Sequence, residues 1–223
     1  TELIRLRGNM PNNVNRQIKL VARPVNYPIE SDFSLVESPF PQPGEGEVLI
    51  QALWLSLDPY MRGRMRDERS YATPVGLGQV MVGGVAGRIV QSRTPAFREG
   101  EIVEGSLGWQ EYAVSDGRNL RKVDPSLGPL STSLGVLGMP GMTAYFGFLE
   151  VGQPRPGDTV VVSAASGAVG QVVGQISKIM GCRTVGIAGT AEKIKYIVND
   201  LGFDAGINYK TENVDSALAE ACP

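Results

Sequence analysis

The stretch Thr159-Val-Val-Val-Ser-Ala-Ala-Ser-Gly-Ala-Val-Gly-Gln-Val-Val-Gly-Gln-Ile-Ser-Lys178 decides the fold of the second half of this chain. Its β-branched start, 159–162, predicts a strand, and the small residues at 163–167 predict a tight turn. Apolar residues then recur at helical spacing and predict one helix face: Val169, Val172, Val173, Ile176 and Ile179. A helix that starts directly after such a turn favours a phosphate, because its first N–H groups are unpaired and its dipole is positive there.

The glycine pattern in this stretch is Ala165-x-Gly167-x-x-Gly170, a variant of the dinucleotide fingerprint with Ala at the first position. A second apolar segment, 183–188, follows at the distance expected for a βαβ unit of about thirty residues. The context therefore favours a dinucleotide site. The alternative is a βαβ unit whose glycines serve only close packing of the helix on the strand.

The end of the second strand indicates which dinucleotide binds. NAD-preferring sites place Asp or Glu there, whereas this chain has the neutral residues 188–191, followed by Glu192 and Lys193. A carboxylate at the strand end would repel a 2′-phosphate, and Lys193 would attract one, so we expect NADP rather than NAD. Tyr209, after a short third strand at 205–208, is placed to pack on the adenosine. The alternatives are a solvated lysine and an ordinary aromatic residue at a strand end.

Composition narrows the function classes. The 223 residues suffice for one large domain or two modest ones, and a net charge of −2 gives no electrostatic indication of nucleic-acid binding. No apolar run is long enough to predict a transmembrane helix. Two cysteines predict no disulfide framework and are typical of a cytoplasmic protein.

The sequence contains no histidine. With Cys182 and Cys222 as the only cysteines, we expect no tetrahedral zinc site and no other metal centre. Ser-His-Asp and Cys-His catalysis are excluded as well. The chemistry must come from a cofactor or from Tyr, Lys and carboxylate side chains.

The sequence pattern changes near residue 134, from short β-like segments to alternating strand and helix patterns. This change predicts two domains, 1–133 and 134–223. The first part predicts an all-β, barrel-like domain with dense Pro and Gly turns and strands at 17–23, 33–37, 47–57, 84–91, 101–104, 110–114 and 119–123. The segment 47–57 is the most apolar and predicts a central strand. The second part predicts a buried helix at 135–149 with Pro140 in its first turn, the βαβ unit, and helices at 191–201 and 214–221.

A doubly wound sheet begins in the second part, but only three of its strands precede Pro223. A dinucleotide fold needs a second half to hold the nicotinamide. We therefore expect the chain to be a fragment of a longer protein.

Four segments carry a resemblance to a known family: Leu55-Ser-Leu-Asp-Pro-Tyr-Met-Arg-Gly-Arg-Met65, Gly138-Met-Pro-Gly-Met-Thr-Ala-Tyr-Phe-Gly147, Ser163-Ala-Ala-Ser-Gly-Ala-Val-Gly170 and Ala205-Gly-Ile-Asn-Tyr-Lys-Thr211. The chain resembles zinc-independent medium-chain dehydrogenases/reductases. Within them it is most similar to the group of NADPH-dependent alkenal and curcumin reductases and leukotriene B4 12-hydroxydehydrogenase/prostaglandin reductases. The resemblance covers essentially the whole chain and implies a GroES-like β-barrel followed by an α/β Rossmann domain, here truncated at its C-terminus.

The resemblance also implies roles for individual residues. The pyrophosphate would lie on Gly167, Ala168, Val169, Gly170 and Gln171, the 2′-phosphate on Lys193 and Tyr209, and the nicotinamide side of the cleft would include Met139 and Thr143. Tyr60, in Asp58-Pro-Tyr-Met-Arg62, would contact the substrate and donate a proton or a hydrogen bond to a developing enolate. The alternative is a tyrosine that packs at a turn, beside solvated Arg62 and Arg64.

These expectations combine into one activity. The resemblance implies NADPH-dependent reduction of the C=C bond of α,β-unsaturated aldehydes or ketones by hydride transfer to the β-carbon, without a metal. A quinone oxidoreductase of the same superfamily and a catalytically silent NADPH-binding or redox-sensing protein are the alternatives. Family members commonly form homodimers, and the same is expected of the full-length protein.

Overall fold

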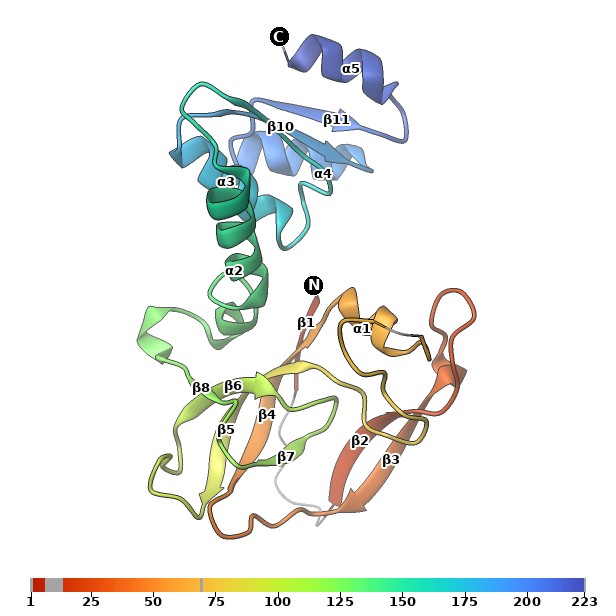
Figure 1. The fold of residues 1–223 in the computed structure, drawn as a ribbon, viewed down its shortest axis with the longest axis vertical. Coiled ribbons are helices and arrows are strands. Elements are labelled where there is room, and N and C mark those ends of the chain that lie inside the picture. Colours follow the sequence, from red (N-terminus) through yellow and green to blue (C-terminus); the bar gives the residue numbers. More distant parts are fainter. Residues whose placement is uncertain (1, 7–13, 69, 223) are drawn as a thin grey trace. The chain divides into compact units, whose positions relative to one another are not determined.

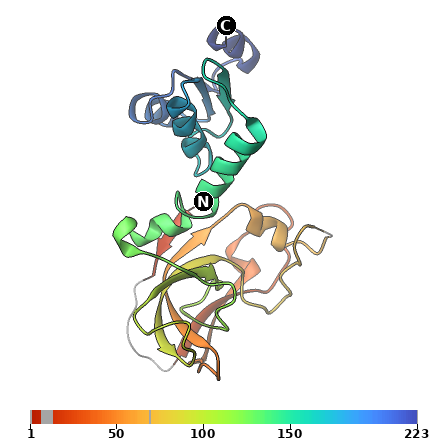
Figure 2. The same cartoon turned by 60° about the vertical axis from the view of Figure 1, so that its left-hand side comes forward.

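A computed structural model describes residues 2–6, 14–68 and 70–222 of the chain. The chain divides into two compact units, Thr1–Leu134 and Gly135–Pro223, one residue later than the boundary that the sequence predicts (Figures 1 and 2). We describe each unit by itself. No helix in the described ranges is long and apolar enough to cross a membrane.

The first unit is built from β-structure. Its larger sheet contains β1 (Glu2–Arg5), β4 (Val48–Leu57), β5 (Gly84–Ser92), β6 (Ile102–Ser106), β7 (Tyr112–Ser115) and β8 (Arg121–Lys122). A second, two-stranded sheet pairs β2 (Val14–Leu20) with β3 (Phe33–Pro39). Every predicted strand is present, and β1 is an additional one that the sequence did not indicate, because its mostly exposed residues show no apolar alternation.

The prediction that 47–57 forms a central strand is confirmed. One edge of β4 pairs with β5, and its other edge is shared by β7 and β1, which pair with its first and second halves. The β4–β5 ladder shifts register at two places, and Gly87 allows the close approach there. A Cβ on Gly87 would lie 2.5 Å from the carbonyl oxygen of Gln51, so only glycine fits without a backbone shift.

The two sheets of this unit are joined by short contacts rather than by a full ladder. Lys19 of β2 forms a bridge with Val80, and the Ile18 N–H donates to the Trp109 carbonyl at 2.9 Å. Within the described residues no ladder closes the sheets into a complete barrel. The observed architecture is therefore a β-rich unit of two associated sheets.

Short helices complete the first unit. They are α1 (Tyr60–Arg64) and the 3₁₀ turns Glu30–Asp32, Pro125–Leu127 and Leu130–Leu134. Two buried clusters form its interior: one around Val48, Ile50, Ile89 and Val103, and one around Leu20, Met61, Met65, Val75 and Met81. The second cluster places α1 against β2, which positions the end of β4 for the site described below.

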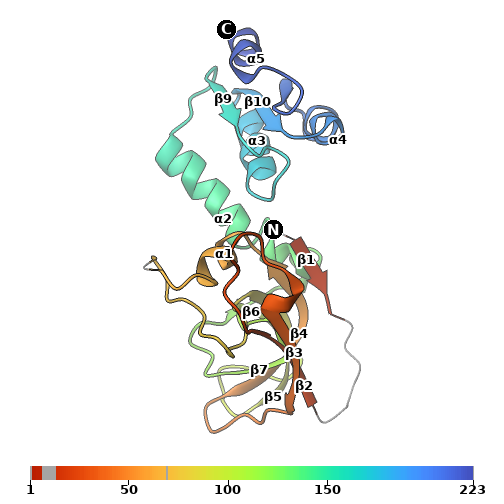
Figure 3. The same ribbon diagram turned by 90° about the vertical axis from the view of Figure 1, so that its right-hand side faces the viewer.

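The second unit is a parallel α/β layer. Its elements are α2 (Met139–Tyr145) with a π-helical continuation Phe146–Gly152, β9 (Thr159–Val162), α3 (Gly170–Ile179), β10 (Arg183–Ala188), α4 (Ala191–Lys195) with a π-helical continuation Tyr196–Asp200, β11 (Ala205–Asn208) and α5 (Val214–Ala221) (Figure 3). The strand order β11-β10-β9, all parallel, is that of a dinucleotide-binding half-sheet.

The face of α3 that packs against the core differs from the predicted one. The buried positions are Gly170, Gly174 and Ser177, whereas Ile179, predicted to be inward, is 82% exposed. The reason is the ring of Phe203, which occupies the space over Gly174 where a side chain would otherwise lie. The branched residues of α3 therefore flank a contact that is made by small residues.

The prediction of a buried helix at 135–149 is also corrected. The helix forms, and Pro140 lies in its first turn as predicted, but its buried residues are Pro140, Gly141 and Ala144. The large apolar side chains are about half exposed: Met139, Met142, Tyr145 and Phe146. As in α3, small residues make the close contact, because a Cβ on Gly141 would overlap the Val136 carbonyl.

Candidate functional site

The turn between β9 and α3 is as tight as the sequence predicts. Ala164 takes a left-handed conformation with φ of 48°, and the Gly167 N–H donates back to its carbonyl at 2.8 Å. A Cβ on Gly170 would lie 2.5 Å from the same carbonyl oxygen and 2.9 Å from Ala165 Cα. Only glycine therefore lets the helix begin this close to the strand.

The start of α3 presents unpaired donors. In the described part of the chain, the backbone N–H groups of Ala168, Val169 and Gly170 donate no hydrogen bond, and the ladder begins with Gln171 donating to Gly167 at 3.0 Å. Three such donors at the positive end of a ten-residue helix can bind an anion. A pyrophosphate on these residues stays a prediction, and the unpaired donors are compatible with it.

A second group of residues gathers at the carboxyl ends of β10 and β11. Tyr209 is 54% exposed, and its ring lies over Gly189, where a Cβ would come within 2.8 Å of it. Lys193 is exposed in the first turn of α4, which Thr190 caps by accepting from the Lys193 N–H at 3.3 Å. The structure thus brings an aromatic face and an exposed cation to one edge of the sheet, and their predicted role in binding a 2′-phosphate stays a prediction.

Met139 and Thr143 lie on one side of α2. The Thr143 hydroxyl donates to the Met139 carbonyl at 2.7 Å and lies 3.7 Å from its sulfur, and both side chains are exposed. Their role beside a nicotinamide remains a prediction.

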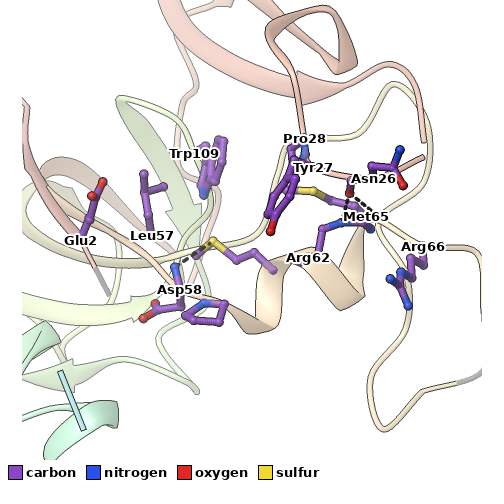
Figure 4. A pocket seen from close by; sticks show the side chains of 12 residues that line it. Glu2, Asn26, Tyr27, Pro28, Leu57, Asp58, Arg62, Met65, Arg66 and Trp109 are labelled. Carbon is purple, nitrogen blue, oxygen red and sulfur yellow. Dashed lines mark hydrogen bonds between the residues drawn. The ribbon is translucent and has the colours of Figure 1, made fainter. Parts of the chain in front are cut away.

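The first unit contains a pocket of about 660 Å³ beside α1, seen in Figure 4. Its lining is mainly apolar and comes from four segments far apart in the sequence: Glu2; Asn26, Tyr27 and Pro28; Leu57, Asp58, Pro59, Met61, Arg62, Met65 and Arg66; and Trp109. The Trp109 ring stacks on Phe33 with centroids 5.6 Å apart, which fixes one wall. A pocket of this size and character accommodates a small apolar molecule.

Two arginines hold the loop that forms another wall of this pocket. Arg62 of α1 donates to the carbonyls of Pro24 and Asn26 at 3.0 and 2.9 Å. Arg23 reaches in the opposite direction, to the carbonyls of Met65 and Val75 at 2.9 and 2.7 Å. Arg64 likewise bonds the Thr73 carbonyl, so the alternative of merely solvated arginines in this motif is wrong.

Tyr60 is the first residue of α1 and does not line the pocket, although its neighbours Pro59 and Met61 do. Its ring is half buried against the cluster that contains Leu20 and Met61. Burial raises the pKa of the Tyr60 phenol, and the nearby Asp58 carboxylate raises it further. An ordinary phenol is already protonated at neutral pH, and this shift moves the pKa of Tyr60 further from neutrality, so the group remains a hydrogen-bond donor but is a weaker acid.

Sequence reasoning missed four residues that contribute to these sites. Gly189 permits the Tyr209 contact, Tyr196 bonds Gln171, and Trp109 with Tyr27 shapes the pocket. Only Gly189 carried a local signal, as a glycine at a strand end. Among the described residues, no group of three or more His, Cys, Asp or Glu side chains is arranged to hold a metal ion.

Comparison with known proteins gives a family match and close relatives. Residues 16–123 match the family described as the N-terminal domain of oxidoreductase. The chain is 50% identical to an NADPH-dependent curcumin reductase of Escherichia coli over 94% of its length, and 44% identical to a 2-alkenal reductase (NADP(+)-dependent) of Nicotiana tabacum, also over 94%. It spans 61% and 63% of the lengths of these two relatives.

A solved structure is also similar to this chain. The crystal structure of CurA from Vibrio vulnificus in complex with NADPH matches with a TM-score of 0.87 and 50% sequence identity, over 92% of this chain and 61% of that one. The similarity therefore includes both units, from the β-rich part to the parallel sheet.

Proposed function

We propose that this chain, whose matches confirm its resemblance to the zinc-independent medium-chain dehydrogenases/reductases, binds NADPH and reduces the C=C bond of α,β-unsaturated aldehydes or ketones. The observation that carries the cofactor part of the proposal is the turn after β9, with three N–H groups unpaired within the described residues and a Gly170 that no other residue could replace without a shift. The C=C reduction is supported by the similarity to a curcumin reductase and a 2-alkenal reductase. When bound, the dinucleotide supplies a hydride to the β-carbon of the substrate.

The residues of the second unit would bind the cofactor in three places. The pyrophosphate would lie on 167–171, the 2′-phosphate against Lys193 and Tyr209, and the nicotinamide side near Met139 and Thr143. The absence of a carboxylate at 188–191 supports NADPH over NADH, because nothing there repels a phosphate.

The first unit would supply the substrate side. Its apolar pocket suits the hydrocarbon part of an enal or enone, and desolvation of that part favours binding. The phenol of Tyr60 is protonated at neutral pH, as an ordinary phenol is, and Tyr60 lies in sequence between the pocket-lining residues Pro59 and Met61; it would donate a hydrogen bond or a proton to the developing enolate.

Two alternatives share the cofactor residues. A quinone oxidoreductase would differ only in the acceptor it reduces. A silent NADPH-binding or redox-sensing protein would bind the dinucleotide without turnover.

Several broader expectations belong to the same proposal. We propose that the first unit is the GroES-like domain of the family, its described strands forming two associated sheets rather than a closed barrel, and that the second is part of a Rossmann domain. The full-length protein would act as a homodimer. Free thiols at Cys182 and Cys222 favour a reducing compartment, for which we propose the cytoplasm.

The direct test measures NADPH oxidation with a panel of 2-alkenals, enones and quinones, using this chain and a longer protein that contains it. We expect turnover of enals and enones by the longer protein at least. Oxidation with quinones alone would establish the first alternative, and NADPH binding without any turnover by either protein would establish the second.

The choice of cofactor is tested by the substitution Lys193→Ala. Losing a charge-assisted contact to the 2′-phosphate should weaken NADPH binding roughly tenfold to hundredfold, with little effect on NADH. Fluorescence titration measures both dissociation constants. Lys195→Ala on the same helix is the matched control, because residues two apart do not share a face. Equal losses for both dinucleotides would refute the role of Lys193.

A further inference from the structure

The Gln171 side chain is held by a residue that no motif in the sequence marks. The phenol of Tyr196 donates to Gln171 Oε1 at 2.9 Å. Gln171 is the second residue of α3, and Tyr196 begins the π-helical continuation of α4. The bond therefore joins the start of α3 to the helix that follows β10.

This hydrogen bond determines which end of the amide is free. With Oε1 occupied by the phenol, Nε2 of Gln171 donates to no acceptor in the described part of the chain. The free end carries two N–H donors, whereas the bound end is an acceptor that an anion would repel. Gln171 directly follows Val169 and Gly170, whose backbone N–H groups donate no hydrogen bond within the described residues.

Tyr196 also shares a helix face with Lys193, because residues three apart on a helix are neighbours. The bond to Gln171 thus ties the face that carries Lys193 to the start of α3. In the chain α3 precedes and α4 follows β10, and β10 ends directly before Gly189, which lies under the Tyr209 ring.

We propose that Tyr196 is a positioning residue for the cofactor pyrophosphate: its phenol orients the Gln171 amide so that Nε2 faces the anion at the start of α3. The inference rests on the proposed function, since it assigns that anion to NADPH. It assigns Tyr196 no contact with the cofactor itself. Its effect passes entirely through Gln171.

The test is a double-mutant cycle on NADPH binding with Tyr196→Phe, Gln171→Ala and both together. Each single variant should raise the dissociation constant about two- to tenfold, the range expected for one hydrogen bond. The double variant should bind no worse than Gln171→Ala alone, because the phenol then has nothing to orient. Tyr71→Phe is the matched control, since it removes a hydroxyl from an 85% exposed tyrosine of the first unit.

Two further ligands separate orientation from general damage. NADH carries the pyrophosphate and should lose affinity in Tyr196→Phe by the same factor as NADPH. In contrast, 2′-AMP carries only the 2′-phosphate and should bind the variant as well as the unaltered chain. A loosened fold would weaken all three ligands.

Additive losses in the cycle, wild-type affinity of Tyr196→Phe, or an equal loss for 2′-AMP would each overturn the inference and leave the proposed function intact. Failure of the unaltered chain to bind NADPH would overturn both.

Discussion

Close contacts in the second unit depend on single glycine residues. Gly170 brings helix and strand together at the phosphate turn, Gly189 receives the Tyr209 ring, and Gly174 receives Phe203. In each case an added Cβ would lie under 3.0 Å from a neighbouring atom. The three glycines therefore act through the absence of a side chain rather than through backbone freedom, since none has a positive φ.

At this scale we predict that Gly174→Ala destabilises the protein by about 1–3 kcal/mol through overpacking. The added methyl would lie 1.9 Å from the buried Phe203 ring, which has little room to move. Urea unfolding followed by circular dichroism measures the loss. Gly147→Ala is the control, because nothing lies within 4 Å of that position and alanine favours helix. A similar loss in both variants would contradict the packing argument.

Elements are held in register by a few polar contacts. Asp204, just before β11, accepts from Lys178 of α3 at 2.7 Å and from the Thr184 N–H of β10 at 2.6 Å. Beneath it the hydroxyls of Ser177 and Thr184 bond each other at 2.7 Å in the buried interior. One carboxylate thus connects the crossover helix to two successive strands.

We predict that Asp204→Asn costs about 1 kcal/mol at neutral pH and less in acid. Burial raises the Asp204 pKa, but hydrogen bonds from Lys178 and the Thr184 N–H outweigh it, so the net pKa is lowered. A lowered native pKa stabilises the fold above the unfolded value of about 4, and this contribution is lost as the pH falls through the native pKa.

The measurement is the free energy of unfolding of both proteins at several pH values from neutral to acid. Asp200→Asn, on the exposed side of the next helix, serves as the control. A difference between Asp204→Asn and the unaltered chain that stays constant down to acid pH would show that the carboxylate charge is not responsible.

At the scale of the whole molecule, the division into two units predicts a local response to the cofactor. The proposed cofactor contacts all lie after residue 134, and the apolar pocket lies wholly before it. At a concentration one hundred times the dissociation constant, a ligand adds about 2.7 kcal/mol to the stability of the part it binds.

We therefore predict that NADPH slows amide hydrogen exchange in β9, β10, β11 and the start of α3, and leaves β2 and β3 unchanged. Exchange followed by mass spectrometry with and without NADPH measures this directly, and the same experiment with adenosine, which carries no phosphate, is the control. Equal protection of both units would contradict a cofactor site confined to the second.

What the sequence determined by itself is local. The β-branched run, the small turn and the helix start follow from torsional preference and periodicity, and the parallel order of β9, β10 and β11 follows from the helices between them. The absence of Asp and Glu at the end of β10, in residues 188–191, can likewise be read directly from the sequence. These features need no knowledge of distant residues.

Only the tertiary structure decided which faces are buried and which side chains meet. Periodicity marked the branched residues of α3 as inward, yet Phe203, far along the chain, makes Gly174 the contact point and leaves Ile179 in solvent. The pocket and the Tyr196–Gln171 bond are likewise made by segments distant in sequence. Such contacts depend on how large side chains fill the space left by small ones, and no local pattern encodes that.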